Sequence, residues 1–173
     1  MTDSQKQKID MLISVLPKHE QEMYREIAEY AVELGYSPSK IKTPLEPVIF
    51  AKTIRSFGNR RLCKIAPPNH EISNELSTGV FLSFYATTDY SEVFNEGVRM
   101  LCESRKSRKT HGGSDKGCGD CNKCTGYFYT YSDGKTTGCC HDKLVEILYI
   151  KEEHVVEIKA MMKAQHECWT YNL

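Results

Sequence analysis

Residues 48–66 read VIFAKTIRSFGNRRLCKIA, and the other predicted elements can be arranged around the sheet that this segment begins. Two runs rich in strand-forming residues lie on either side of Gly58-Asn59, a pair that is compatible with a two-residue turn. The segment therefore predicts a β-hairpin. A third run, residues 79–87, is dense in Val, Phe and Tyr and predicts an interior strand of the same sheet.

Helices are predicted before and after these strands. Apolar residues recur at helical spacing in residues 4–16 and again in residues 23–34, and the second helix should end at Gly35. Further along the chain, an apolar stripe predicts a helix over residues 91–102. Glutamates at the start of residues 152–168 favour a C-terminal helix there.

The order of the predicted elements indicates the fold class. Two helices precede three strands, and a helix, a glycine- and cysteine-rich loop, three more strands and a final helix follow. Because strands and helices occur in separate runs, the predicted class is α+β rather than a doubly wound parallel sheet. We expect one domain, residues 1–173, in which N-terminal and C-terminal helices pack on a mainly antiparallel sheet and residues 105–141 form an insertion.

Charge is balanced over the whole chain but not along it. Lys and Arg together number 23, as do Asp and Glu, so the composition does not indicate a globally basic nucleic-acid binder. Between Lys40 and Lys64, however, seven basic residues stand against Glu46 alone. A second basic run leads into the cysteine-rich loop: Arg105, Lys106, Arg108 and Lys109. This run predicts a site for an anionic ligand or nucleic acid, although cations at this position also stabilise the dipole of the preceding helix.

The cysteine content bears on both compartment and chemistry. The first residues contain no apolar leader, and the longest apolar run, residues 80–86, is far too short to cross a bilayer. We therefore expect a cytoplasmic protein that does not enter a membrane. Thiols stay reduced in that compartment, so the eight cysteines favour metal or thiol chemistry over a disulfide framework.

Five of the cysteines form two groups with the spacing of a zinc site: Cys118, Cys121 and Cys124, then Cys139 and Cys140. The two-residue gaps let a tight turn direct successive thiolates inward, and a later cysteine can complete a tetrahedron around zinc. The pattern resembles zinc ribbons and zinc knuckles, over residues 118–141 only. An iron–sulphur cluster is the alternative, but the segment lacks the Cys-Pro ending of bacterial ferredoxin motifs.

A predicted hairpin returns the second group of cysteines to the first. Alternating aromatic and threonine residues precede Asp133-Gly134, which favours a two-residue type I′ turn at that pair. Counting outward from this turn, Phe128 should lie opposite Cys139 in the antiparallel pair.

The same alternation bears on the choice of the fourth ligand. Adjacent strand residues point to opposite faces, so only one of Cys139 and Cys140 is expected to bind the metal. Cys139 is favoured because it would share a face with Phe128 and, by extension, with Cys124. Cys140 and His141 are the alternatives.

A site of four thiolates has no open coordination position, so the predicted zinc ion is structural and the protein is a binding or interaction module. The alternative is a thiol redox protein, or a switch that releases its metal on oxidation, acting through Cys118, Cys121 and Cys124. The sequence contains no local signature of nucleophilic, phosphate-binding or dinucleotide-binding chemistry. It therefore identifies no catalytic residue, and it leaves an enzymatic role and the oligomeric state open.

Overall fold

The computed structural model describes residues 1–68, 78–106, 126–139, 143–147 and 150–171, with only the backbone of Arg105, Lys106 and Cys139. Five strands form one antiparallel sheet in the order β1-β2-β3-β4-β7. Their bounds are Ser37–Pro38 for β1, Val48–Ile54 for β2, Gly58–Ala66 for β3, Gly79–Leu82 for β4 and Val145–Ile147 for β7. Two further strands, β5 (Tyr127–Thr130) and β6 (Thr136–Cys139), pair with each other.

The turn between β2 and β3 differs from the prediction. It comprises residues 55–57, whereas Gly58 and Asn59 already belong to β3 and pair with β2. The expected two-residue turn at Gly58-Asn59 is therefore wrong. The observed register places Phe50 opposite Cys63, so that two buried side chains meet on the same face of the sheet.

Strand β4 is an interior strand, as predicted. It pairs with β3 on one side and β7 on the other, and all four of its residues are buried. The strand is shorter than the predicted 79–87. Beyond Leu82 the contact with β3 continues for one more residue, since the Ser83 N–H donates to the carbonyl oxygen of Leu62 at 2.9 Å.

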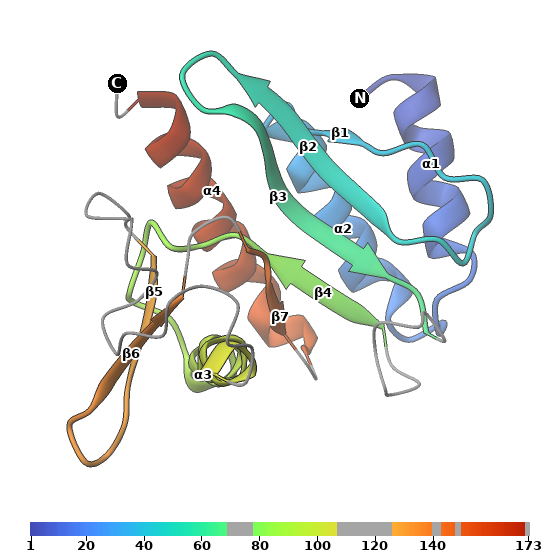
Figure 1. The fold of residues 1–173 in the computed structure, drawn as a ribbon. Coiled ribbons are helices and arrows are strands. Elements are labelled where there is room, and N and C mark those ends of the chain that lie inside the picture. The colour runs from blue at the N-terminus through green and yellow to red at the C-terminus, as the bar shows by residue number, and fades with distance from the viewer. Residues whose placement is uncertain (69–77, 107–125, 140–142, 148–149, 172–173) are drawn as a thin grey trace.

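Three helices cover one face of the sheet (Figure 1). Their bounds are Asp3–Ile13 for α1, Gln21–Glu33 for α2 and Val155–Tyr171 for α4. Apolar side chains from these helices join those of the sheet in one buried cluster, among them Ile9, Leu12, Ile27, Ile158 and Met162. The end of α2 at Gly35 is confirmed, because the Tyr36 N–H donates to the carbonyl oxygen of Ala31 at 3.0 Å in a capping bond.

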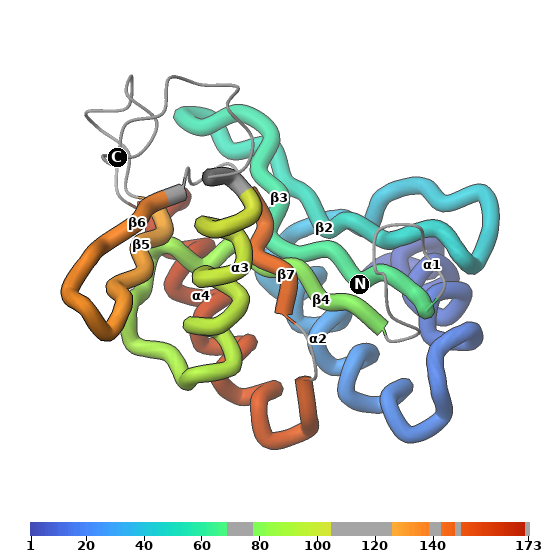
Figure 2. The backbone as a smooth tube through the Cα atoms, turned by 60° about the horizontal axis from the view of Figure 1, so that its bottom comes forward, coloured from blue at the N-terminus to red at the C-terminus, as the bar shows by residue number. Residues whose placement is uncertain are grey.

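Helix α3 (Glu92–Lys106) occupies a different position, between the edge strand β7 and the β5–β6 hairpin (Figure 2). It contacts both of them. Gly97 permits the close approach to β7, because a Cβ atom at this position would lie only 2.7 Å from the carbonyl oxygen of Glu146. By packing on the backbone of β7, α3 covers one edge of the sheet.

The described part of the chain is α+β, with a five-stranded antiparallel sheet and four helices, which confirms the predicted class. Helix α4 begins at Val155, after a single 3₁₀ turn over Glu152–His154 where the helix itself was expected. The predicted zinc-binding loop lies outside the described residues. Among the described helices, none combines the length and the apolar character that crossing a membrane requires.

Candidate functional site

The predicted metal ligands fall almost entirely outside the described part of the chain: Cys118, Cys121, Cys124 and Cys140, together with the alternative His141. Cys139 is the last residue of β6, and only its backbone is described. The structure therefore shows the elements from which the cysteine segment leaves and to which it returns.

The second basic run is divided in the same way. Arg105 and Lys106 are the last two residues of α3, with only their backbone described. Arg108 and Lys109 lie outside the described residues. The predicted contact of this run with an anionic ligand or nucleic acid stays a prediction.

The β5–β6 hairpin has a different register from the predicted one. The Gly134 N–H donates to the carbonyl oxygen of Tyr131 at 2.9 Å, and the Tyr131 N–H donates to that of Lys135 at 2.8 Å. These bonds close a three-residue loop, a common hairpin connection in which the last loop residue is left-handed, as Gly134 is with φ of 80°. Both loop types suit an Asp-Gly pair, so the local sequence did not distinguish them.

The longer loop shifts the strand pairing by one residue. Tyr127 lies opposite Cys139, and Phe128 lies opposite Gly138. The predicted pairing of Phe128 with Cys139 is therefore wrong, and with it the argument that favoured Cys139 over Cys140 as the fourth ligand. Both cysteines remain candidates.

Tyr127 fixes the start of β5 to the core of the protein. Its side chain is only 2% exposed, and its hydroxyl oxygen accepts a hydrogen bond from the Phe84 N–H at 3.0 Å. The ring packs edge to face against Phe84 and Tyr85, with centroids 5.3 and 6.1 Å away. Phe128, the next residue, is 60% exposed. The chain is thus anchored three residues after Cys124.

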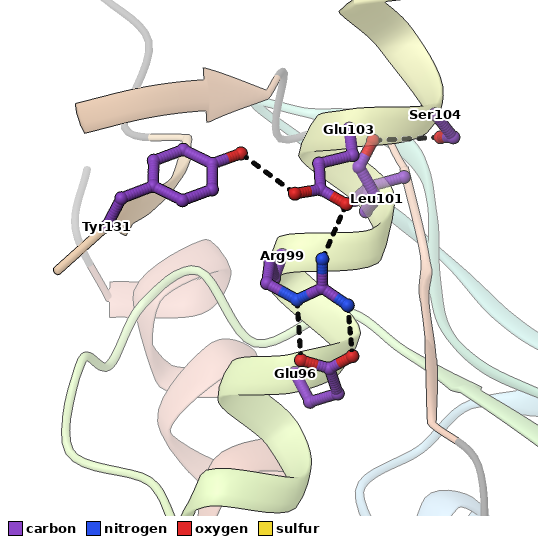
Figure 3. A network of polar contacts seen from close by, with 6 residues as sticks. All are labelled: Glu96, Arg99, Leu101, Glu103, Ser104 and Tyr131. Atoms are coloured by element: carbon purple, nitrogen blue, oxygen red, sulfur yellow. Dashed lines mark hydrogen bonds and ion pairs between the residues drawn. The ribbon is translucent and has the colours of Figure 1, made fainter. Parts of the chain in front are cut away.

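A polar network holds the turn end of the hairpin against α3 (Figure 3). The Tyr131 hydroxyl donates to the Glu103 carboxylate at 3.1 Å, and Arg99 donates to the same carboxylate at 2.6 Å. Arg99 also donates two hydrogen bonds to Glu96, of 2.7 and 2.5 Å. The hydrogen bond from Arg99 lowers the pKa of the Glu96 carboxyl. All of these groups lie on the hairpin or α3, so the network makes one unit of the two elements.

A cavity of about 320 Å³ lies where β3 extends past the end of β4. Its lining comes from β3, from the residue after β4, from the two residues before β7 and from α4. The lining residues are Asn59, Arg60, Arg61, Ser83, Lys143, Leu144 and Trp169. None of the described lining residues is acidic. The cavity therefore joins two arginines of the first basic stretch to a lysine that follows Cys140 by three residues.

Two contacts order the wall of this cavity. The guanidinium of Arg60 lies 5.6 Å from the ring centroid of Phe57, and the indole N–H of Trp169 donates to the Tyr85 hydroxyl oxygen at 2.5 Å. Burial raises the pKa of Tyr85, while the positive charge of Arg60 acts in the opposite direction. The phenol therefore stays neutral.

Sequence reasoning identified the stretch that contains Arg60 and Arg61 but missed Ser83, Lys143 and Trp169. Lys143 reaches the cavity because β7, which begins two residues later, pairs with β4. That pairing joins segments more than sixty residues apart, and no local pattern signals it.

Two described cysteines outside the segment belong to the core of the protein. Cys63 and Cys102 are 0% and 1% exposed, and both belong to the buried cluster. Burial raises the pKa of the Cys63 thiol, which keeps it protonated and unsuited to bind a metal. Among the described residues, no three or more His, Cys, Asp or Glu side chains gather in a group that could hold a metal ion.

The described candidate site thus comprises a cavity with basic residues in its lining, and the unit of hairpin and α3 on either side of the cysteine segment. Its function has to be inferred from this chain's own residues. Comparisons with protein-family models, with curated proteins and with solved structures match nothing to this chain.

Proposed function

We propose that the protein is a binding module for an anionic partner, in which one structural zinc ion folds the insertion of residues 105–141. Cys118, Cys121 and Cys124 supply three thiolates, and Cys139 or Cys140 supplies the fourth. A closed set of four thiolates leaves no position for water or substrate, so the ion acts on folding rather than on a reaction.

The anchored hairpin supports a shared site for the two groups of cysteines. Cys124 precedes Tyr127 by three residues, which span at most about 11 Å of extended chain. Cys139 is the strand partner of Tyr127, and paired residues lie about 5 Å apart. Both groups of cysteines are therefore tied to Tyr127, the first through the chain and the second through strand pairing, and the Tyr127 side chain is fixed in the core.

The basic cavity is the observation that carries the anionic partner. Arg60, Arg61 and Lys143 line one concave surface. The fold thus gathers basic residues from distant parts of the sequence into one lining, on a chain of zero net charge. Because Lys143 follows Cys140 so closely, a metal that orders the cysteine segment also positions the third cation.

Elemental analysis of protein purified under reducing conditions tests the zinc directly, and we expect one zinc ion per chain. Replacing Cys139 and Cys140 by serine, one at a time, should abolish zinc binding in only one of the two variants. Cys168→Ser is the matched control, because Cys168 is a free thiol on α4, and this variant should keep its zinc.

Chelation tests the link between the metal and the cavity. Removing zinc should weaken the binding of an anionic probe such as inorganic phosphate, and should leave the circular dichroism of the helices nearly unchanged. Binding should also weaken as the salt concentration rises. A zinc-loaded protein that binds no anion at low salt would contradict the proposal.

The same preparation can also support the alternative function, thiol redox chemistry. Metal-free protein in which two thiols of Cys118, Cys121 and Cys124 pass two electrons and two protons to oxidised glutathione, forming a disulfide, would be a redox protein. An iron–sulphur chromophore in the purified protein would contradict the zinc assignment as well.

A further inference from the structure

The end of α4 packs against the Tyr36 side chain, which is fully buried between α2 and β1 along the chain. The Tyr36 ring packs edge to face against His166, with centroids 5.7 Å apart, and its centroid lies 6.4 Å from that of Trp169. The Tyr36 hydroxyl oxygen lies 3.3 Å from Nδ1 of His166. One buried tyrosine therefore connects the start of β1 with two residues of α4.

The hydrogen bonds of this cluster require a neutral His166. The Thr170 hydroxyl donates to the carbonyl oxygen of His166 at 2.7 Å, so its hydrogen is not directed at Nδ1. The Tyr36 hydroxyl donates to Nδ1, because a buried phenol needs an acceptor and Nδ1 lies beside it. Nδ1 accepts a hydrogen bond only while it carries no hydrogen, which is the case in a neutral imidazole alone.

Burial and a neighbouring cation also favour the neutral imidazole. Burial lowers the pKa of His166, and the positive charge of Lys52 lowers it further, whereas Glu167 on α4 acts in the opposite direction. Lys52 belongs to β2 and donates to the carbonyl oxygen of Leu34, at the end of α2, at 3.3 Å. The cation is thereby held on the side of the sheet that faces His166.

The other titratable side chains around Tyr36 stay uncharged as the pH falls. Burial raises the pKa of Tyr36 itself, of Cys63 in β3 and of Tyr85 after β4. These groups are therefore protonated at neutral pH and remain so in acid. His166 is the group of this cluster that gains a charge.

We propose that the end of α4, residues 166–171, is a pH-sensitive switch, in which protonation of His166 breaks its hydrogen bond with Tyr36 and detaches the helix end from the sheet. An imidazolium carries a hydrogen on Nδ1, so the buried Tyr36 hydroxyl loses its acceptor and the new charge faces Lys52. A helix end near a chain terminus opens at a low free energy while the rest of the protein stays folded. Trp169 lines the cavity described above, so detachment changes the wall of that cavity. The switch requires neither the zinc ion nor the anionic partner.

Trp169 reports the switch, since it is the only tryptophan of the chain. Its side chain is 2% exposed, so it should be protected at neutral pH from acrylamide, an uncharged quencher of tryptophan fluorescence. Quenching is measured on the full-length protein from about pH 8 to pH 5, the range in which histidines titrate. It should increase only below the ordinary histidine pKa of about 6.5, because the folded protein lowers the pKa of His166. Constant quenching over the whole range would overturn the switch.

His166→Gln assigns the effect to one side chain. Glutamine keeps an acceptor for the Tyr36 hydroxyl but takes up no proton in this range, so quenching should stay low throughout. His19→Gln is the matched control, because His19 follows α1 and its side chain is 83% exposed, and this variant should behave like the wild type. Zinc release in acid would act on the wild type and on His166→Gln alike, so the difference between them isolates His166. An equal increase in the two proteins would overturn the switch.

Two further variants separate proton uptake from detachment. Uptake is followed by NMR titration of the imidazole signal that is missing from His166→Gln. Tyr36→Phe should raise the pKa of His166 by about one pH unit, since the neutral form loses one hydrogen bond, and it should reduce the acid exposure of Trp169, since no buried hydroxyl loses its acceptor. Lys52→Gln should also raise this pKa, but Trp169 should still become exposed in acid. Wild-type quenching profiles in Tyr36→Phe, or an unchanged His166 pKa in both variants, would overturn the switch.

Discussion

The helix-covered sheet and the β5–β6 hairpin are ordered by different means. In the sheet, burial is distributed over many positions: every residue of β4 is buried, and three helices add their own apolar faces. In the hairpin, Tyr127 is buried, whereas Phe128 is exposed and Tyr131 is held by a hydrogen bond. The sheet therefore tolerates the loss of any one contact better than the hairpin does, and the hairpin should open at a lower free energy.

Tyr127→Ala gives the largest expected effect, because it removes the main apolar anchor of the hairpin. Truncating a buried aromatic side chain costs about 3–5 kcal/mol, and the Phe84 N–H also loses its acceptor. The measurement is the free energy of unfolding in urea, together with amide exchange in β5 and β6. Phe128→Ala is the matched control, and it should change stability by less than about 0.5 kcal/mol. Equal effects of the two variants would contradict the anchor.

Gly97→Ala tests the contact between α3 and the sheet. The added Cβ would meet the Glu146 carbonyl oxygen at 2.7 Å and the Ile147 side chain at 2.8 Å, so the helix must move away from β7. Such overpacking costs about 1–3 kcal/mol, of which the better helix propensity of alanine offsets up to about 1 kcal/mol. We expect a net loss of about 1–2 kcal/mol in thermal or urea unfolding. Met100→Ala, at an exposed position of α3, is the control. A more stable Gly97→Ala protein would contradict the close packing.

The same contrast explains what the sequence could and could not predict. Helices and the interior strand were predicted because their burial is periodic or continuous along the chain, as in residues 79–82. The two turns were wrong because Gly58-Asn59 and Asp133-Gly134 each suit more than one loop, and the choice depends on which side chains become buried. For the hairpin, the burial of Tyr127 fixes the register, and that contact is made with Phe84, a residue distant in the chain.

The cavity shows the same limit at the level of function. The basic stretch that contains Arg60 was visible in the sequence, but the position of Lys143 in the same lining was not. The two come together only through the order β3-β4-β7, in which each pairing joins distant segments. A site composed in this way is predictable only after the strand order is known.

The same substitution, glycine to alanine, can be made in the sheet and in the hairpin, so the two regions can be compared directly. Gly58 and Gly134 both have a left-handed backbone, with φ of 70° and 80°, and open space around the position of a Cβ atom. Alanine at either position should cost about 1 kcal/mol of local strain. In Gly58→Ala the cost should appear in global urea unfolding, because β2–β3 is part of the sheet. In Gly134→Ala it should appear mainly as faster amide exchange in the hairpin. Identical patterns for the two variants would show that the regions unfold together.

Tyr131→Phe removes the hydrogen bond to Glu103 and has a smaller expected effect. The lost hydrogen bond to Glu103 joins partly exposed groups, so the free energy of unfolding should fall by about 0.5–1 kcal/mol. Amide exchange in the hairpin turn should quicken more than exchange in β4. Tyr171→Phe, in which an exposed hydroxyl on α4 is removed, is the control and should leave both measurements unchanged. Uniformly faster exchange in the whole protein would contradict a role confined to the hairpin.

The pH dependence of the α3 network should give the smallest effect. The hydrogen bond from Arg99 makes the pKa of Glu96 lower in the folded protein than in the unfolded chain. Its stabilisation is therefore fully present above the unfolded pKa, and it is lost as the pH falls through the folded value. Glu96→Gln should reduce the loss of stability between pH 7 and pH 3 in urea unfolding. Glu92→Gln, at the exposed start of α3, is the control and should retain the wild-type profile. Because Glu96 is about half exposed, solvent screens its ion pair with Arg99, and the change in the profile should be small. A large change would contradict this screening.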